Sequence, residues 1–286
     1  MKEYQIFTDA TSDLQEDLES VKVIPMNVEI GEDDYVYGPQ GNISCKEFYE
    51  LQRQGNYAHT SQINVLEYEK YFEEVLKGGK DVLYISFSSG MSGTYQTACL
   101  CRNELMEKYP EQKIVCVDSL CAAVGEGLLV KEVDKKKREG LSMDELVDWI
   151  EDNKMNLCHW FTVDNFDHLK HGGRVSAVAA TLGNTLNIKP LLRVDEEGKL
   201  RVVKKIRGRH KAMAAQVECI ARTWNPEISK SVVIAHGDDL KAAEELKEYV
   251  EKRLPDAEVC ISEIGPIIGA HTGPGVMVLV FWGSER

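Results

Sequence analysis

The sharpest transition in the sequence is Asp81-Val-Leu-Tyr-Ile-Ser-Phe-Ser-Ser-Gly-Met-Ser-Gly-Thr-Tyr-Gln96. An apolar, strand-forming run ends in serine and glycine, and a segment compatible with a helix, 94–108, follows at once. The first N–H groups of a helix have no partner within it and lie at the positive end of its dipole. Ser88, Ser89 and Ser92 would add hydroxyl donors there. The stretch therefore predicts either an anion site or an ordinary strand–turn–helix unit, and this segment alone leaves both open.

Strands and helices alternate through the first half of the chain. Capping residues begin helices at Ser44, Asn64 and Ser142, and Pro25 indicates a sheet edge or a bulge. The predicted elements are strands at 4–8, 21–30, 81–87 and 113–117, and helices at 44–55, 64–78, 94–108, 125–139 and from 142 onward. This order predicts an α/β fold in which a mainly parallel sheet carries helices on both faces.

The second half mixes a hairpin with helices. Asp195-Glu-Glu-Gly198 is a hairpin turn between predicted strands, and residues 264–275 hold enough glycine and proline to form a shaped loop. The predicted elements are strands at 157–163, 188–194, 199–206, 231–235, 258–264 and 276–282, and helices at 175–182, 210–224 and 239–254. We therefore expect an α/β domain over residues 1–157 and a two-layer α+β domain over residues 158–286.

Composition and charge restrict the function. The chain has 286 residues and a formal net charge of −13, which disfavours nucleic acid as a partner because phosphate binding requires a basic surface. No apolar run approaches the roughly 20 residues that span a bilayer. Met1-Lys-Glu-Tyr4 leads directly into a predicted strand, so we expect no signal peptide and a cytoplasmic location.

Acidic and hydroxyl residues follow the first predicted strand, in Phe7-Thr-Asp-Ala-Thr-Ser-Asp-Leu14. They lie at the end of the strand where open α/β sheets hold ligands. Asp9 and Asp13 could form a magnesium or phosphotransfer site. The same residue types also commonly cap a following helix, so both interpretations remain open.

Donors of hydrogen bonds occur in three other segments. Thr60 and Ser61 precede a predicted helix. Their hydroxyl groups could bind a ligand or could only cap the N-terminus of that helix. Gly172-Gly173 permits the backbone to approach other groups closely, and the two glycines leave the position of Arg174 adjustable. The guanidinium of Arg174 matches the geometry of a carboxylate or a phosphate. His271 lies in the loop rich in glycine and proline. The alternative interpretations are that Arg174 is a solvated residue of a turn and that His271 has only a structural role.

No catalytic set is evident in the sequence. It contains no G-x-S-x-G elbow, no P-loop, no G-x-G-x-x-G at a first βα turn and no H-E-x-x-H. Cys158 and His159 are neighbours on a predicted strand, so they point to opposite faces and cannot cooperate as nucleophile and base. Hydroxyls and glycine amides, with one arginine and one histidine, favour a site that holds an anion without reacting with it.

Taken in order along the chain, these segments resemble the DegV family of bacterial fatty-acid-binding proteins. The matching motifs span nearly the whole chain and are Thr8-Asp-Ala-Thr-Ser-Asp-Leu14, Thr60-Ser-Gln62, Ser92-Gly-Thr-Tyr-Gln96, Gly172-Gly-Arg-Val-Ser176, Ile188-Lys-Pro190, Arg207 and Gly269-Ala-His-Thr-Gly-Pro-Gly275. One position departs from the family, because Ile63-Asn64 stands where the family often has Pro-Ser. Asn64 can still cap the following helix.

The resemblance implies a two-domain fold, a buried fatty acid and no cofactor. Thr60, beside Ser61, and Ser92 resemble the carboxylate-binding hydroxyls of the family, and Gly93 would supply an N–H group. Arg174 and His271 resemble the residues that complete the head-group network. A tail of ~16 carbons, at ~0.8 kcal/mol per buried methylene, would contribute most of the binding in an apolar tunnel. Candidate lining residues are Phe166, Leu182, Leu186, Ile267 and Ile268.

For members of the FakB type, the resemblance further implies a protein that is not itself an enzyme. It would present the carboxylate of a fatty acid of the palmitate or oleate class to a fatty acid kinase, which makes the acyl phosphate. Two other classes remain open. One is a metal-dependent hydrolase or phosphotransferase that uses Asp9, Asp13 and Ser92, and the other is an interaction protein with an empty pocket.

Residues 199–211 form a basic segment in a chain that is acidic overall. Its cationic residues are Lys199, Arg201, Lys204, Lys205, Arg207, Arg209 and Lys211. Nucleic acid fits poorly, because no aromatic residues interleave for stacking. The segment predicts a docking face for an acidic patch of a partner kinase, or for transient contact with anionic membrane lipid. The alternative is a solvated strand edge protected by lysines.

Overall fold

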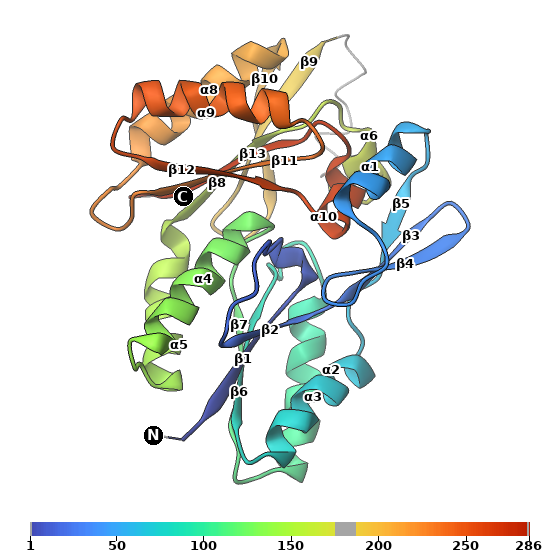
Figure 1. The fold of residues 1–286 in the computed structure, drawn as a ribbon, viewed down its shortest axis with the longest axis vertical. Coiled ribbons are helices and arrows are strands. Elements are labelled where there is room, and N and C mark those ends of the chain that lie inside the picture. The colour runs from blue at the N-terminus through green and yellow to red at the C-terminus, as the bar shows by residue number, and fades with distance from the viewer. Residues whose placement is uncertain (1, 175–186, 285) are drawn as a thin grey trace.

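The computed structural model describes residues 2–174, 187–284 and 286, and Figure 1 shows how the elements are arranged. The strands are β1 (Tyr4–Asp9), β2 (Val21–Ile24), β3 (Met26–Ile30), β4 (Asp33–Tyr37), β5 (Ala58–Thr60), β6 (Asp81–Ser86), β7 (Ile114–Asp118), β8 (Leu157–Thr162), β9 (Ile188–Val194), β10 (Leu200–Arg207), β11 (Ser231–His236), β12 (Glu258–Glu263) and β13 (Met277–Trp282). The helices are α1 (Cys45–Arg53), α2 (Val65–Lys77), α3 (Thr94–Lys108), α4 (Val124–Arg138), α5 (Met143–Asn153), α6 (Asp167–His171), α8 (Arg209–Thr223), α9 (Leu240–Arg253) and α10 (Pro266–Thr272), with single 3-10 turns at η1 (Ala10–Ser12) and η2 (Lys154–Asn156).

The first sheet is parallel throughout and has the order β2-β1-β6-β7. Consecutive side chains of a strand point to opposite faces of the sheet, and nearly all side chains of the two central strands, β1 and β6, are buried, so these strands are covered on both faces. Phe7 and Tyr84 pack with α2 and α3, whereas Ile6 and Leu83 pack with α4 and α5. The predicted α/β fold with helices on both faces is therefore confirmed.

Local capping explains where the first helices begin. Ser44 forms a full capping box with Glu47 at the start of α1. The Asn64 side chain accepts the N–H of Glu67 at 3.0 Å and caps α2, so the departure from the family at this position leaves the helix start intact. The helix predicted at 94–108 has those bounds in the structure.

One predicted strand and one predicted loop were wrong. The run 21–30 is two strands, because Pro25 separates β2 in the parallel sheet from β3 in an antiparallel sheet of order β4-β3-β5. We did not predict β4, which is rich in charge, or β5, which has three residues. The loop expected at 264–275 contains the helix α10, which starts with Pro266 in its first turn, where proline fits.

The third sheet has the order β10-β9-β8-β13-β11-β12 and is mixed. α8 and α9 cover one face, where Trp160 and Leu279 are buried with them. The two-layer α+β arrangement of the second half is thus confirmed, and so is the hairpin between β9 and β10. The helix predicted at 175–182 lies outside the described residues.

The other face of the third sheet packs on the first half of the chain. Phe161 and Val278 share a buried cluster with Leu129 of α4 and Ile6 of β1. α4 is therefore packed between the two large sheets, as Figure 1 shows. A division of the chain into domains near residue 157 stays a prediction. Within the described residues, no helix has both the length and the apolar composition needed to cross a membrane.

Candidate functional site

A cavity of about 300 Å³ lies where the carboxyl edge of the parallel sheet faces the third sheet. The segments after β1, β6 and β7 supply one side of it, and β8, β13 and α10 supply the other. All six residues that the resemblance assigned to the head group line this cavity, namely Thr60, Ser61, Ser92, Gly93, Arg174 and His271. The fold therefore brings together residues that are as far as 211 positions apart in the sequence.

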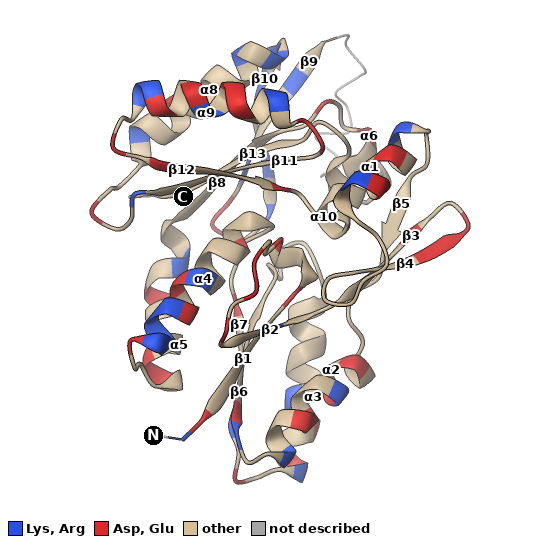
Figure 2. Cartoon of the chain, viewed as in Figure 1, with Lys and Arg blue, Asp and Glu red and all other residues tan. Residues whose placement is uncertain are grey.

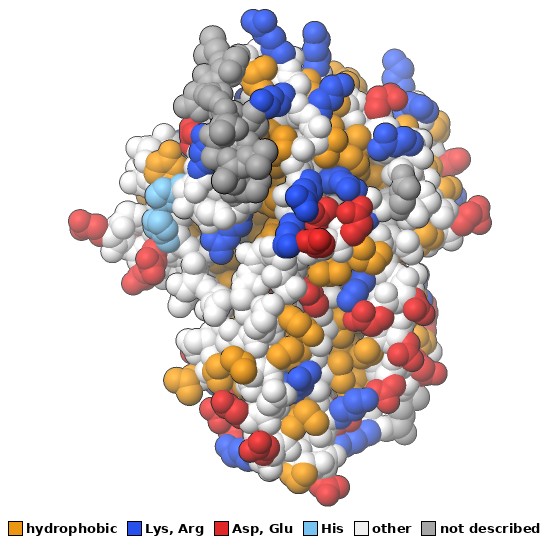
Figure 3. Space-filling model, turned by 180° about the vertical axis from the view of Figure 1, so that it is seen from behind, with side chains coloured by type: hydrophobic (Ala, Val, Ile, Leu, Met, Phe, Trp, Pro, Cys, Tyr) orange, Lys and Arg blue, Asp and Glu red, His pale blue; other side chains and the backbone are white. Residues whose placement is uncertain are grey.

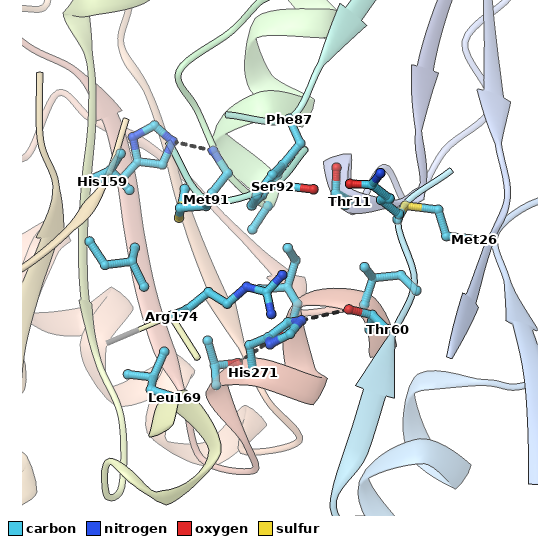
Figure 4. A pocket seen from close by; sticks show the side chains of 18 of the residues that line it. Thr11, Met26, Thr60, Phe87, Met91, Ser92, His159, Leu169, Arg174 and His271 are labelled. Carbon is cyan, nitrogen blue, oxygen red and sulfur yellow. Dashed lines mark hydrogen bonds between the residues drawn. The ribbon is translucent and has the colours of Figure 1, made fainter. Parts of the chain in front are cut away.

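Thr60 and His271 are joined by a hydrogen bond. The Thr60 Oγ1 atom at the end of β5 lies 2.8 Å from Nε2 of His271 on α10, and Figure 4 shows the pair beside Arg174. Burial, with smaller contributions from Arg174 and two other histidines, lowers the pKa of His271 to about 4. The imidazole is therefore neutral at neutral pH. Its Nδ1 atom is buried and has no partner among the described residues.

Glycine is required where α6 meets His271. A Cβ atom at Gly172 would lie 2.1 Å from Nδ1 of His271, so any other residue would displace the ring. Gly173 adopts φ = +70°, which lets the N–H of Arg174 reach the carbonyl of Leu169 at 3.0 Å. The Arg174 guanidinium donates to the carbonyl of Gly172, and burial lowers the pKa of Arg174. The Gly-Gly pair thus directs the arginine toward the cavity.

The turn before α3 supplies the opposite side of the polar end. Ser92 Oγ accepts the N–H of Thr94 at 3.2 Å and lies 2.8 Å from the Thr94 hydroxyl. Gly93 begins α3 without a side-chain cap, and among the described residues no acceptor is found for its N–H. A Cβ atom at Gly93 would lie 2.4 Å from Oε1 of Gln62, so glycine allows the segment after β5 to pack on this turn. The turn keeps the donors expected of an anion site.

The rest of the cavity is mainly apolar. Its walls include Met26, Phe87, Met91, Ala122, Ala123, Phe161, Leu169, Val194, Leu200, Ile267, Ile268 and Val278. Two of the lining residues suggested by the sequence, Ile267 and Ile268, are among them. Phe166, which the sequence also suggested, does not line the cavity, because it is buried in the core around α4. Leu182 and Leu186 lie outside the described residues.

His159 and Thr11 also line the cavity and were not predicted. His159 accepts the N–H of Ala122 at 3.3 Å and lies 3.1 Å from the carbonyl of Leu157. Burial, and less strongly the charge of Arg286, lowers its pKa to about 3, so this ring is also neutral. The neighbouring Cys158 packs in the core on the α8 side of the sheet, as the alternation of side chains on a strand requires.

The structure does not bring Asp9 and Asp13 to the cavity with Ser92. Asp9 accepts the Thr11 N–H at 3.0 Å and the Tyr84 hydroxyl at 2.5 Å, and Asp13 accepts the Gly265 N–H at 3.0 Å. Burial raises the pKa of both carboxyl groups. Neither carboxyl lines the cavity, whereas Ser92 does. Across the described ranges, no group of three or more His, Cys, Asp or Glu side chains could hold a metal ion.

Comparison with known proteins gives a consistent result. Residues 3–283 match the family described as "Uncharacterised protein, DegV family". A DegV domain-containing protein of Clostridium perfringens is 39% identical over 292 residues, which cover 100% of this chain and 99% of the relative. The crystal structure of a fatty acid binding DegV family protein from Streptococcus agalactiae superposes with a TM-score of 0.86 at 26% identity, and each chain is covered to 100%. The Streptococcus pneumoniae Fatty Acid Kinase (Fak) B3 protein, loaded with linoleic acid, shares the fold with a TM-score of 0.84 at 21% identity, over 98% of this chain and 99% of that one.

Proposed function

Because this chain belongs to the DegV family, we propose that it binds a long-chain fatty acid in the cavity between its two large sheets. The observation that carries the proposal is the distribution of polarity in that cavity. Thr60, Ser92, Arg174 and His271 gather around one region, and apolar side chains form most of the remaining wall. A fatty acid has the same division, with one anionic group and a long apolar tail.

The head group would be bound mainly by neutral donors. Ser61, Ser92 and the N–H of Gly93 offer hydrogen bonds to a carboxylate, and Thr60 is oriented by His271. Arg174 would add a charge-assisted hydrogen bond. These donors require no metal ion to hold the anion. The net charge of −13 would repel a carboxylate, so binding of the anion depends on these local hydrogen bonds.

The tail would contribute most of the free energy of binding. At ~0.8 kcal/mol per buried methylene, a tail of ~16 carbons outweighs one head group. Met26, Met91 and Phe161 belong to the wall, and methionine adapts its shape readily to a flexible ligand. The relative from Streptococcus agalactiae, which is described as fatty acid binding, supports the same assignment.

We extend the proposal to presentation of the fatty acid to a kinase. The support is the resemblance to FakB-type proteins and the basic residues of β10, an edge strand of the third sheet. Figure 2 marks Lys and Arg positions in blue in this part of the fold. In this role the chain would hold the carboxylate in place, and a separate kinase would phosphorylate it. We propose a cytoplasmic location for this exchange.

Mass spectrometry of the purified protein tests the binding proposal. We expect extraction with organic solvent to release a long-chain fatty acid in stoichiometric amount, and the delipidated protein to take up palmitate or oleate. A protein that carries no fatty acid and takes none up would contradict the proposal. Hydrolysis of acyl esters that is lost in His271→Ala would favour the enzyme alternative.

A further inference from the structure

Four of the seven histidines lie together beside the polar end of the cavity, namely His59, His168, His171 and His271. The proposed function uses only His271. His59 directly precedes Thr60 on β5, and His171 is the last residue of α6. Both are exposed, and Figure 3 shows histidine side chains gathered at one place on the surface.

The rings of His59 and His171 face each other through equivalent nitrogen atoms. Their Nε2 atoms are 3.0 Å apart, and the ring centroids are 4.6 Å apart. Tyr57 stacks on His171 with a centroid distance of 4.4 Å and an interplanar angle of 20°, which fixes the orientation of that ring. Two imidazoles in this position can share a hydrogen bond. They can also present two lone pairs to one cation.

We propose that His59 and His171 together bind a divalent transition-metal ion of the zinc class. Imidazole nitrogen suits Zn²⁺, Cu²⁺ and Ni²⁺. Zn–N bonds of about 2.0–2.1 Å in a tetrahedral site require the two nitrogen atoms to separate by only roughly 0.3 Å more than they do here. No third ligand of the His, Cys, Asp or Glu type completes the set among the described residues, so water would have to fill the other coordination positions. The net charge of −13 favours a cation at the surface.

An ion at this pair would act on the neighbouring cavity. It would connect β5, next to Thr60, to the end of α6, from which the chain continues to Arg174. It would also place positive charge near His271, whose pKa already responds to both histidines. The metal should therefore strengthen the binding of a carboxylate. This coupling rests on the proposed function, whereas the metal site itself does not.

Titration of the tag-free protein with Zn²⁺ by calorimetry, in buffer without chelator, tests the site. We expect one ion to bind, and His59→Gln or His171→Gln to abolish this binding, because glutamine keeps a polar exposed side chain but is a poor zinc ligand. His210→Gln is the matched control, since His210 is exposed on α8 and contacts Glu245. Equal zinc binding by the wild type and the His59→Gln/His171→Gln double variant would overturn the proposal.

A second titration tests the coupling. Palmitate affinity of the wild type should rise severalfold when Zn²⁺ is present, whereas the double variant should show no change. The double variant also controls for zinc carboxylate complexes in solution. If zinc binds to the pair but leaves palmitate affinity unchanged, the coupling is wrong and the site stands. If no palmitate binds at all, the proposed function fails and the zinc result is unaffected.

Discussion

Thr60 and Ser92 reach the cavity from separate elements, and each offers one hydroxyl proton. We predict that Thr60→Ala combined with Ser92→Ala weakens binding of palmitate. A hydrogen bond to a charged acceptor contributes about 1.5–3 kcal/mol, which corresponds to about a tenfold to hundredfold loss of affinity for each hydroxyl. Fluorescence or calorimetric titration of delipidated protein measures the effect.

Ser89→Ala provides the control for this experiment, because Ser89 lies in the same turn but does not line the cavity. It should bind palmitate like the wild type. Unaltered affinity in the Thr60→Ala/Ser92→Ala variant would mean that the carboxylate lies elsewhere.

Asp13 gives a prediction about pH at the residue scale. Burial raises the pKa of this carboxyl, whose Oδ2 atom has no partner among the described residues. A carboxyl whose pKa is higher in the folded state stabilises the fold below its unfolded pKa, and this contribution is lost as pH rises. Asp13→Asn keeps the acceptor for Gly265, and asparagine tolerates φ = +49°. We expect the variant to gain stability relative to the wild type as the pH rises above about 4, the ordinary pKa of an aspartate.

Urea denaturation across that pH range measures the difference. Asp17→Asn, at an exposed carboxylate nearby, controls for the loss of one negative charge. A constant difference between Asp13→Asn and the wild type at all pH values would show that Asp13 does not titrate in this way. Loss of a metal-dependent activity in the variant would instead revive the magnesium hypothesis.

Residues that line the cavity could be predicted where a motif fixes their type and spacing. Thr60, Ser92 and Arg174 were found in this way, and they do line the cavity. His159 could not be found, because its role depends on which face of β8 meets α4. The sequence shows that Cys158 and His159 point to opposite faces of a strand. Only the packing of the sheets shows that the face with His159 is the one toward the cavity.

At the scale of elements, the structure refines the basic segment around β10. Three of its seven cations are engaged, because Lys199 pairs with Glu197, Arg201 with Asp195, and Arg209 with Asp164 and Asp239. The others, Lys204, Lys205, Arg207 and Lys211, are exposed and have no ion pair among the described residues. β10 is also an edge strand, as the lysine-protected alternative requires.

Charge reversal at Lys204 and Lys205 distinguishes docking from simple edge protection. We predict that Lys204→Glu/Lys205→Glu keeps fatty-acid affinity but slows kinase-dependent formation of acyl phosphate. The defect should shrink as ionic strength rises, since salt screens exposed charges over about 10 Å at 0.1 M. Arg209 is left unchanged, because it forms two ion pairs and donates a hydrogen bond to the carbonyl of Gly275 at 3.0 Å.

The control carries the same change of charge near the opposite edge of the sheet. Lys230→Glu/Lys252→Glu fits, since both lysines are exposed, Lys230 lies just before β11 and Lys252 lies on α9. An equal slowing in the control, or normal kinetics of Lys204→Glu/Lys205→Glu at low salt, would show that β10 is a solvated edge strand and not a docking surface.

Elements with strong local signals were predictable, and those stabilised by distant contacts were not. Capping at Ser44, Asn64 and Ser142 located three helices. β5 is too short to have a pattern of its own and exists because β3 pairs with it. α10 was missed because glycine and proline favour loops locally, whereas Ile267 and Ala270 bury this turn against the β3 side of the core.

At the scale of the whole molecule, the two halves form one site that neither half contains alone. Thr60 and Ser92 come from the first half, and Arg174 and His271 come from the second. The buried cluster around α4 and the hydrogen bond from Tyr49 to the carbonyl of Ile264, at 2.9 Å, hold the halves together. The order of strands and helices predicted the two large sheets separately, but not the small sheet β4-β3-β5. It could not predict how the sheets face each other, because that depends on side chains distant in the sequence.

A crystal structure of the protein with a bromine-labelled stearate tests the central claim most directly. We predict that the carboxylate lies within hydrogen-bond distance of Thr60 Oγ1 or Ser92 Oγ, and that anomalous scattering places the bromine among the apolar walls of the cavity. A carboxylate beside His159, or a fatty acid bound outside this cavity, would contradict the account.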